Sequence, residues 1–160
     1  TPLKLTLFPT KTRTYKSHEP LEVVWERLIR RTHLSYNLVS IPTDKSFLGE
    51  VHNSSFRIIS SVVGYGALCI LKGQMEEGVI RVNVSIHPVF KVLLGVLMIG
   101  PVVATIIGIW IGSPDNPIGI LLSGFIFSGI VRFAYVELLF RRFARRSLQR
   151  LIDVMDLEEL

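Results

Sequence analysis

The hydrophobic positions divide the chain into a segment of mixed, charged sequence and a segment almost free of charge. Residues 1–91 interleave apolar and charged side chains, whereas residues 92–131 contain one charged residue, Asp115. Uncharged apolar runs of this length are typical of membrane-spanning helices rather than of a globular core. The pattern therefore predicts a cytoplasmic α+β domain over 1–91, a transmembrane hairpin over 92–140 and an amphipathic cytoplasmic tail over 141–160.

The N-terminal domain begins with a predicted strand and a predicted helix. Leucines alternate with polar residues over 3–7, which indicates a half-buried strand that ends near Pro9. The polar stretch 10–16 is expected to be extended or looped. Ser17 and Pro20 are helix-start signals. The residues that follow place one apolar face along a helix: Leu21, Val24, Trp25, Leu28 and Ile29.

Short strand-like runs separated by turn signals fill the rest of this domain. Because such short connections join antiparallel neighbours, they predict a meander. The fold class expected is α+β, with a small antiparallel meander sheet, one covering helix, a two-helix transmembrane hairpin and an amphipathic C-terminal helix. The predicted strands are 37–41, 47–51, 55–63, 67–75 and 79–87.

The charge distribution predicts the orientation of the hairpin. Its spans are expected at 92–112 and 118–140, joined by a turn at 113–117 that carries no Lys or Arg. Basic residues precede the first span and follow the second, so both termini are expected in the cytoplasm. The charge pattern therefore predicts a multi-pass membrane protein with its turn on the outer side. The basic residues expected at lipid headgroups are Lys91, Arg132, Arg141, Arg142, Arg145 and Arg146.

Small residues recur along both predicted spans. Since small residues let helix backbones approach closely, they are candidates for helix packing. Two interpretations are open: the hairpin packs against itself through them, or one groove receives a partner helix or a second copy of the chain. The candidate packing residues are Gly100, Ala104, Gly108 and Gly112 in the first span, and Ser123, Gly124 and Ser128 in the second.

Two charged residues interrupt the second span, and an amphipathic helix continues beyond it. Arg132 lies near the expected cytoplasmic interface, and Glu137 is spaced to pair with Arg141. Interfacial anchoring is favoured over an ion or proton pathway. The apolar side of the following tail can lie on the bilayer, pack on the soluble domain or pair with another subunit. Its positions are Phe140, Ala144, Leu148, Leu151 and Met155.

Composition adds few candidates for chemistry. The net charge is +5, but six of the 18 Lys and Arg residues follow the second apolar segment from Arg132 onward. The others are scattered rather than interleaved with aromatics, which argues against nucleic acid. Cys69 and the four histidines have no metal-ligand spacing, and no phosphate loop or nucleophile elbow occurs. We therefore expect neither an enzyme nor a cofactor or metal.

The glycine and phenylalanine pattern of the sheet region resembles that of a group of small bacterial membrane proteins. The resemblance covers about residues 47–110 and implies a sheet domain followed by a transmembrane hairpin in a bacterial inner membrane. It carries over no functional residue. The motifs are Phe47-x-Gly49-x-Val51, Phe56-x-Ile58, Gly64-Tyr65-Gly66, Lys72-Gly73 and Gly78-x-Ile80-x-Val82.

The function expected from the sequence is that of a non-catalytic membrane adaptor or accessory subunit. Its partners would be anionic lipid headgroups and either another membrane protein subunit or a second copy of itself. Two alternatives remain open: a pore-forming effector, and a regulator that holds a lipid or metabolite between sheet and helix near Trp25 and Tyr65.

Overall fold

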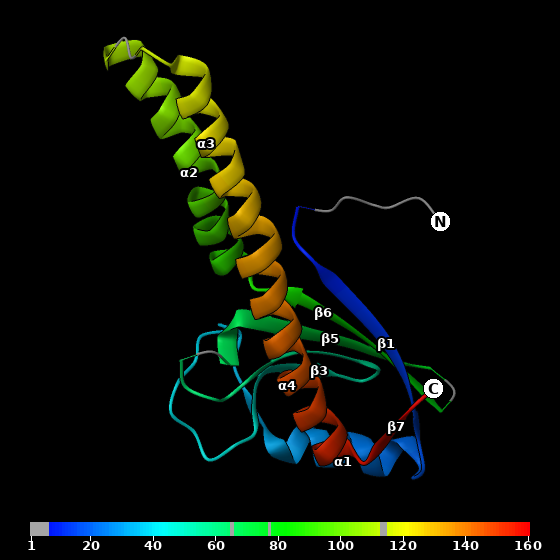
Figure 1. The fold of residues 1–160 in the computed structure, drawn as a ribbon. Helices are drawn as coiled ribbons and strands as arrows, with labels where there is room; N and C mark the ends of the chain where they lie inside the picture. Colours follow the sequence, from blue (N-terminus) through cyan, green and yellow to red (C-terminus); the bar gives the residue numbers. More distant parts are fainter. Residues whose placement is uncertain (1–6, 65, 77, 113–114) are drawn as a thin grey trace. The chain divides into compact units, whose positions relative to one another are not determined.

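The computed structural model describes residues 7–64, 66–76, 78–112 and 115–160 (Figure 1). These residues form two compact units, which are described separately. The first unit contains the chain up to His87 together with Phe140–Leu160, and the second contains Pro88–Leu139. The hairpin segment is therefore an insertion between two parts of the first unit.

The first unit is built on a seven-stranded sheet in the order β2-β3-β4-β5-β6-β1-β7. The short strand β2 runs parallel to β3, and every other neighbouring pair is antiparallel. The predicted α+β class is confirmed, but the sheet is mixed rather than a purely antiparallel meander. The strands are β1 (Thr10–Ser17), β2 (Thr32–Leu34), β3 (Phe47–His52), β4 (Ser55–Ser60), β5 (Cys69–Glu76), β6 (Val79–Ile86) and β7 (Leu157–Glu159), with a short 3-10 turn at Gly66–Leu68 before β5.

One predicted strand is wrong, and one stretch that the sequence left open is a strand. The strand expected at 37–41 was wrong, because this stretch is a loop that inserts Leu38 as a core residue. The stretch 10–16, expected to be extended or looped, is extended: it forms most of β1, and these residues pair with β6. The strand expected over 3–7 falls largely outside the described residues.

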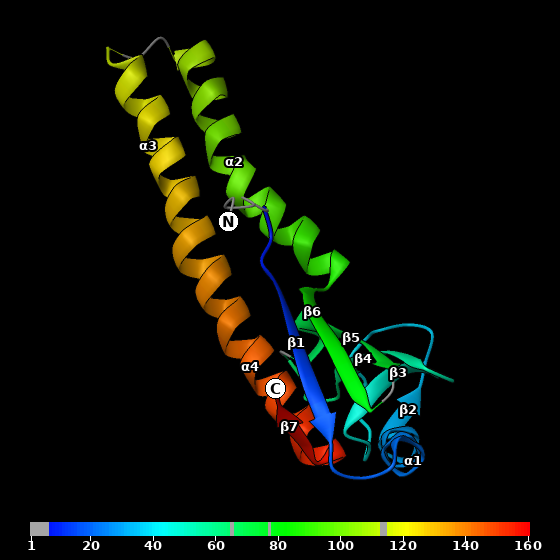
Figure 2. The ribbon, with the colours of Figure 1, turned by 90° about the vertical axis from the view of Figure 1, so that its right-hand side faces the viewer.

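Two helices, not one, cover the principal face of the sheet (Figures 1 and 2). The first is α1 (Leu21–Arg31), which buries Val24 and Leu28. The second is the C-terminal part of α4 (Glu137–Met155), which lies against strands that carry Tyr15, Ile80 and Val82. The apolar side of the tail therefore packs on the sheet, one of the three arrangements that its sequence left open. Its buried positions are Phe140, Ala144, Ser147, Leu148, Leu151 and Met155.

A smaller apolar cluster lies on the opposite face of the sheet. Leu48, Ile59 and Ile70 stand side by side on β3, β4 and β5, and Leu38 from the preceding loop covers them. Ala67 packs against the edge of the same cluster. The loop 35–46 is therefore held in place by side-chain burial rather than by strand pairing.

The second unit contains two packed helices. The helix α2 (Pro88–Gly112) is followed by α3 (Pro117–Ile130), and a π-helical segment, η2 (Val131–Val136), leads into α4. Two helical stretches, Pro88–Gly112 and Pro117–Met155, are long and apolar enough to cross a membrane. These dimensions are compatible with the predicted two-span hairpin.

Truncating a buried side chain of α4 tests whether this helix holds the first unit together. We expect Leu151→Ala to lower the free energy of unfolding by about 2–5 kcal/mol, because it leaves a cavity at a fully buried position. Leu160→Ala is the matched control, since Leu160 is exposed, and should change it by less than about 0.5 kcal/mol. Denaturant unfolding in detergent, followed by tryptophan fluorescence, measures both. Equal effects of the two variants would contradict this packing.

Candidate functional site

The contact between α2 and α3 uses only part of the predicted small-residue set. A methyl group at Gly124 would lie 2.7 Å from Oγ1 of Thr105 and 3.2 Å from the carbonyl oxygen of Pro101. The hydroxyl of Ser128 donates a hydrogen bond to the carbonyl oxygen of Met98. Gly124 and Ser128 thus lie where the two helices of the hairpin approach each other. They support packing within the hairpin.

The small residues of α2 lie outside the contact between α2 and α3. Methyl groups built at Gly100, Gly108 and Gly112 would have no described atom within 4 Å, and Ala104 is exposed. On α3, the hydroxyl of Ser123 donates to the carbonyl of Ile120 in its own helix. The ridge along α2 is therefore not used by α3, which leaves it open as a surface of the second unit.

The charged residues within the second span meet in the π-helical segment. The guanidinium of Arg132 lies 3.4 Å from a carboxylate oxygen of Glu137 and 5.5 Å from the ring centre of Phe133. A π-helical turn widens the backbone and re-aims side chains. Here it brings together a cation and an anion five positions apart in the chain. The pairing reduces the cost of burying either charge in an apolar segment.

The remaining basic residues predicted at headgroups lie on two helices. Lys91 is part of the first turns of α2 and is half-buried. Arg141, Arg142, Arg145 and Arg146 are exposed on α4, between the buried positions that face the sheet. The amphipathic pattern of α4 thus separates an apolar face on the sheet from a basic face.

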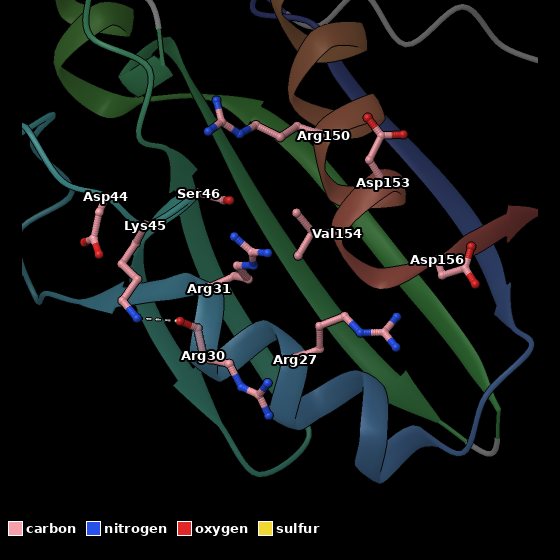
Figure 3. Close-up of a pocket in the computed structure, with 10 residues that line it drawn as sticks. All are labelled: Arg27, Arg30, Arg31, Asp44, Lys45, Ser46, Arg150, Asp153, Val154 and Asp156. Carbon is pink, nitrogen blue, oxygen red and sulfur yellow. Dashed lines mark hydrogen bonds between the residues drawn. The ribbon is translucent and has the colours of Figure 1, made fainter.

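A cavity of the first unit lies between α1, the loop before β3 and the C-terminal part of α4 (Figure 3). It is called the α1–α4 cavity below. Its volume is about 820 Å³. Three carboxylates, Asp44, Asp153 and Asp156, lie along it with Ser46 and Val154. Cations outnumber them, five to three: Arg27, Arg30, Arg31, Lys45 and Arg150.

The cations of this cavity are largely unpaired with carboxylates. Arg27 forms an ion pair with Glu19 at 2.6 Å. Among the residues that the structure describes, no ion pair joins Arg30, Arg31 or Arg150 to a carboxylate. Figure 3 shows the Arg31 guanidinium just above the end of α1, and the Arg150 side chain extending sideways from α4 across the sheet. A positive site therefore stands open between them.

The wall of the cavity formed by α1 is fixed by hydrogen bonds. The backbone N–H of Ser46 donates to the carbonyl of Arg31 at 2.9 Å, and Nζ of Lys45 donates to the carbonyl of Arg30 at 2.8 Å. The hydroxyl of Thr32 donates to the carbonyl of Leu28, and its backbone N–H donates to the carbonyl of Ile29. The last turn of α1 and the loop before β3 thus form one connected wall.

A shallower basic hollow lies on the other face of the sheet. It has a volume of about 380 Å³ and is lined by Arg57, Lys72 and Arg81. Glu50 stands directly opposite Arg57 on the neighbouring strand, and His52 lies beside Glu50. Cross-strand pairing of opposite charges is ordinary for the solvated face of a sheet.

The groups with potential for catalysis or metal binding are dispersed. Burial raises the pKa of the Cys69 thiol to about 12, so this thiol stays protonated at neutral pH. Partial burial lowers the pKa of His87, which leaves its imidazole neutral at pH 7. Within the described ranges, no group of three or more His, Cys, Asp or Glu side chains could hold a metal ion. The non-catalytic interpretation remains a prediction.

Sequence reasoning missed the α1–α4 cavity. It placed a possible ligand near Trp25 and Tyr65; Trp25 is half-buried on α1, and Tyr65 lies outside the described residues. The arginines at the end of α1 were attributed to the helix dipole. The sequence did contain one signal that was missed. Charged residues cluster at the end of α1 and again in the loop at 44–45, and only the short strand β2 and the rest of the loop lie between them.

No protein-family model, curated protein or solved structure matches the chain. The resemblance of residues 47–110 to a group of bacterial membrane proteins accordingly stays a prediction.

Two glycine-to-alanine substitutions test which glycines lie at the α2–α3 contact and which lie on the open ridge of α2. We expect Gly124→Ala to destabilise the α2–α3 contact by about 1–3 kcal/mol, because the new methyl meets Thr105 and Pro101. Gly108→Ala adds the same group in open space and should be neutral. Thermal unfolding of both variants in the same detergent measures the difference. A neutral Gly124→Ala would refute this contact.

Thiol labelling tests the burial of Cys69. At pH 8 we expect a maleimide to modify the folded protein at least about a hundredfold more slowly than the denatured chain, because the thiol is both inaccessible and protonated. The labelled fraction is followed over time by mass spectrometry. Rapid labelling of the folded protein would show that β5 opens readily.

Proposed function

We propose that the chain is a non-catalytic membrane adaptor whose hairpin associates with another membrane helix or with a second copy. The observation that carries this proposal is the open ridge of α2, formed by Gly100, Ala104, Gly108 and Gly112, which α3 does not cover. The hairpin packs instead through Gly124 and Ser128. The small residues of α2 are therefore available for a partner helix in this proposal.

The physical basis of the association is close backbone approach. The hydrophobic effect does not favour association of helices within hydrocarbon. Dispersion contacts and weak Cα–H hydrogen bonds between close backbones stabilise the association instead. A ridge of small residues every four positions allows a second helix to approach along α2 over its length. Larger side chains on the remaining outer positions, such as Ile106 and Ile107, suit lipid contact.

Charge favours a cytoplasmic position for the sheet unit in the inner membrane. Lys72, Arg81 and Lys91 precede the first apolar helix, and the arginines of α4 follow the second, whereas the connecting turn has no Lys or Arg. Basic residues are retained on the cytoplasmic side. We therefore propose that both termini are cytoplasmic and that the exposed arginines of α4 attract anionic headgroups.

The continuity of α4 supports an adaptor role. The helix begins within the second unit, at Glu137, and ends within the first, where its apolar side forms part of the core. A partner bound to the hairpin would therefore be linked to the sheet unit through a helix as well as through the connection at His87.

The pore-forming alternative receives less support. The exposed positions of α2 and α3 in the described residues are mainly Val, Ile, Leu and Phe. A water-filled pore needs a polar stripe along the helices that line it.

Substitution on the ridge tests the adaptor proposal. We expect Gly108→Leu to weaken association by about tenfold or more, because it blocks backbone approach. Gly129→Leu is the matched control, since Gly129 also faces open space but lies on α3. Crosslinking in native membranes, followed by sizing in mild detergent, reports the complex. A single chain without partners, both before and after substitution, would refute the proposal.

A further inference from the structure

The α1–α4 cavity combines three features that the adaptor role does not require. It is concave, with a volume within the range of about 300–1,000 Å³ that is typical of small-molecule sites. Its cations come from two neighbouring segments, α1 and the loop before β3, and from the distant helix α4. Its wall along α1 is held rigid by backbone hydrogen bonds. We propose that this cavity binds a small phosphate-bearing anion with at least two negative charges.

The charge balance of the cavity identifies the ligand as an anion. Five cationic side chains line it against three carboxylates, and Glu19 pairs with one of the cations, Arg27, so one net positive charge remains. Arg30, Arg31 and Arg150 form no ion pair with a carboxylate of the described chain. Figure 3 shows Asp153 and Asp156 directed away from Arg31, so the center of the cavity is left to the cations. An anion placed there would neutralise groups that now repel each other.

The kind of cation indicates phosphate. A guanidinium is planar and offers forked donors that match two oxygens of a phosphate. Arg31 and Arg150 line the cavity from different helices, so a phosphate chain with two or more phosphates could contact both. Lys45 adds a point charge on the loop side, although its ammonium already donates to the carbonyl of Arg30.

Two other classes of anion fit less well. Single-stranded nucleic acid is bound by a basic groove with aromatic side chains on which bases stack, and no aromatic residue lines this cavity. A phosphate held through Mg²⁺ needs clustered carboxylates, and the described residues contain no such metal group. Direct binding by arginine is therefore the mode that the cavity favours.

The site is preorganised for such a ligand. The carbonyls at the end of α1 are bonded by Thr32, Lys45 and Ser46, so Arg30 and Arg31 project from a fixed turn. On the other side, Leu151 and Met155 are fully buried and hold the turn of α4 that carries Arg150. Binding would then order side chains only, at a low entropic cost. This inference does not depend on the membrane role, because every lining residue belongs to the first unit.

Titration calorimetry of the full chain in a neutral detergent tests the proposal with two probes. Inorganic tripolyphosphate represents a soluble phosphate, and a short-chain phosphatidic acid represents a lipid headgroup. We expect saturable binding of at least one probe to a single site, weakened by added salt. The probe that binds more tightly identifies the source of the phosphate. Absence of saturable binding to both would overturn the proposal.

Variants locate the site. We expect Arg31→Gln and Arg150→Gln each to weaken binding at least about tenfold, and Arg31→Lys to weaken it less, because the charge is kept and the fork is lost. Arg81→Gln removes the same charge from the other face of the sheet and should leave affinity within about twofold. A comparable loss with Arg81→Gln would overturn the proposal by showing general attraction to a basic surface.

Each variant is first checked by its thermal unfolding midpoint, so that loss of binding is not confused with loss of fold. Arg30→Gln, at an exposed position, replaces any variant that unfolds. Unchanged affinity in folded Arg30→Gln and Arg31→Gln together would also overturn the proposal.

Discussion

The burial of one side of α4 on the sheet is the contact on which the rest of the structure depends. Tyr15, Ile80 and Val82 belong to strands whose inner face this helix covers, and β7 then extends the sheet beside β1. The first unit is completed only by a segment that follows the hairpin in the sequence. The hairpin is therefore an insertion into a sheet domain rather than an anchor appended to it. Both of its ends are fixed in the fold of that domain.

This topology gives α4 two roles. Its N-terminal turns continue the π-helical segment that pairs Arg132 with Glu137, whereas its C-terminal turns carry Arg150 to the α1–α4 cavity. A ligand that contacts both α1 and α4 binds better when α4 is packed on the sheet than when it is not. Such a ligand would therefore stabilise the packed position of α4.

Periodicity was a reliable guide to the helices but not to the strands. The apolar faces of α1 and α4 were readable because their positions repeat with the helical period, and the same positions are buried. The strand β1 was missed because Tyr15 is its only fully buried side chain. The loop 37–41 looked like a strand because it is a short, largely apolar run that ends at a turn signal, yet its Leu38 covers a cluster instead. Gly73 was readable as a motif, but only the structure gives its cause: the ring of Phe56 occupies the place of a side chain there.

The cavity could not be predicted, because Arg31 and Arg150 are far apart in the sequence and come to line one cavity only in the folded chain.

The arginines at the end of α1 illustrate why a local explanation was incomplete. Cations near a helix C-terminus interact favourably with its free carbonyl groups, typically by about 0.3–1 kcal/mol. In this helix the carbonyls of Leu28, Ile29, Arg30 and Arg31 already accept hydrogen bonds from Thr32, Lys45 and Ser46. The carbonyl groups at the C-terminal end of α1 are therefore bonded by neutral donors and one lysine, without the arginines. A further cation, Arg150, is brought beside these arginines by an unrelated helix, which raises their mutual repulsion. Asp44, Asp153 and Asp156 offset part of this repulsion, and the anion that we propose would offset more of it.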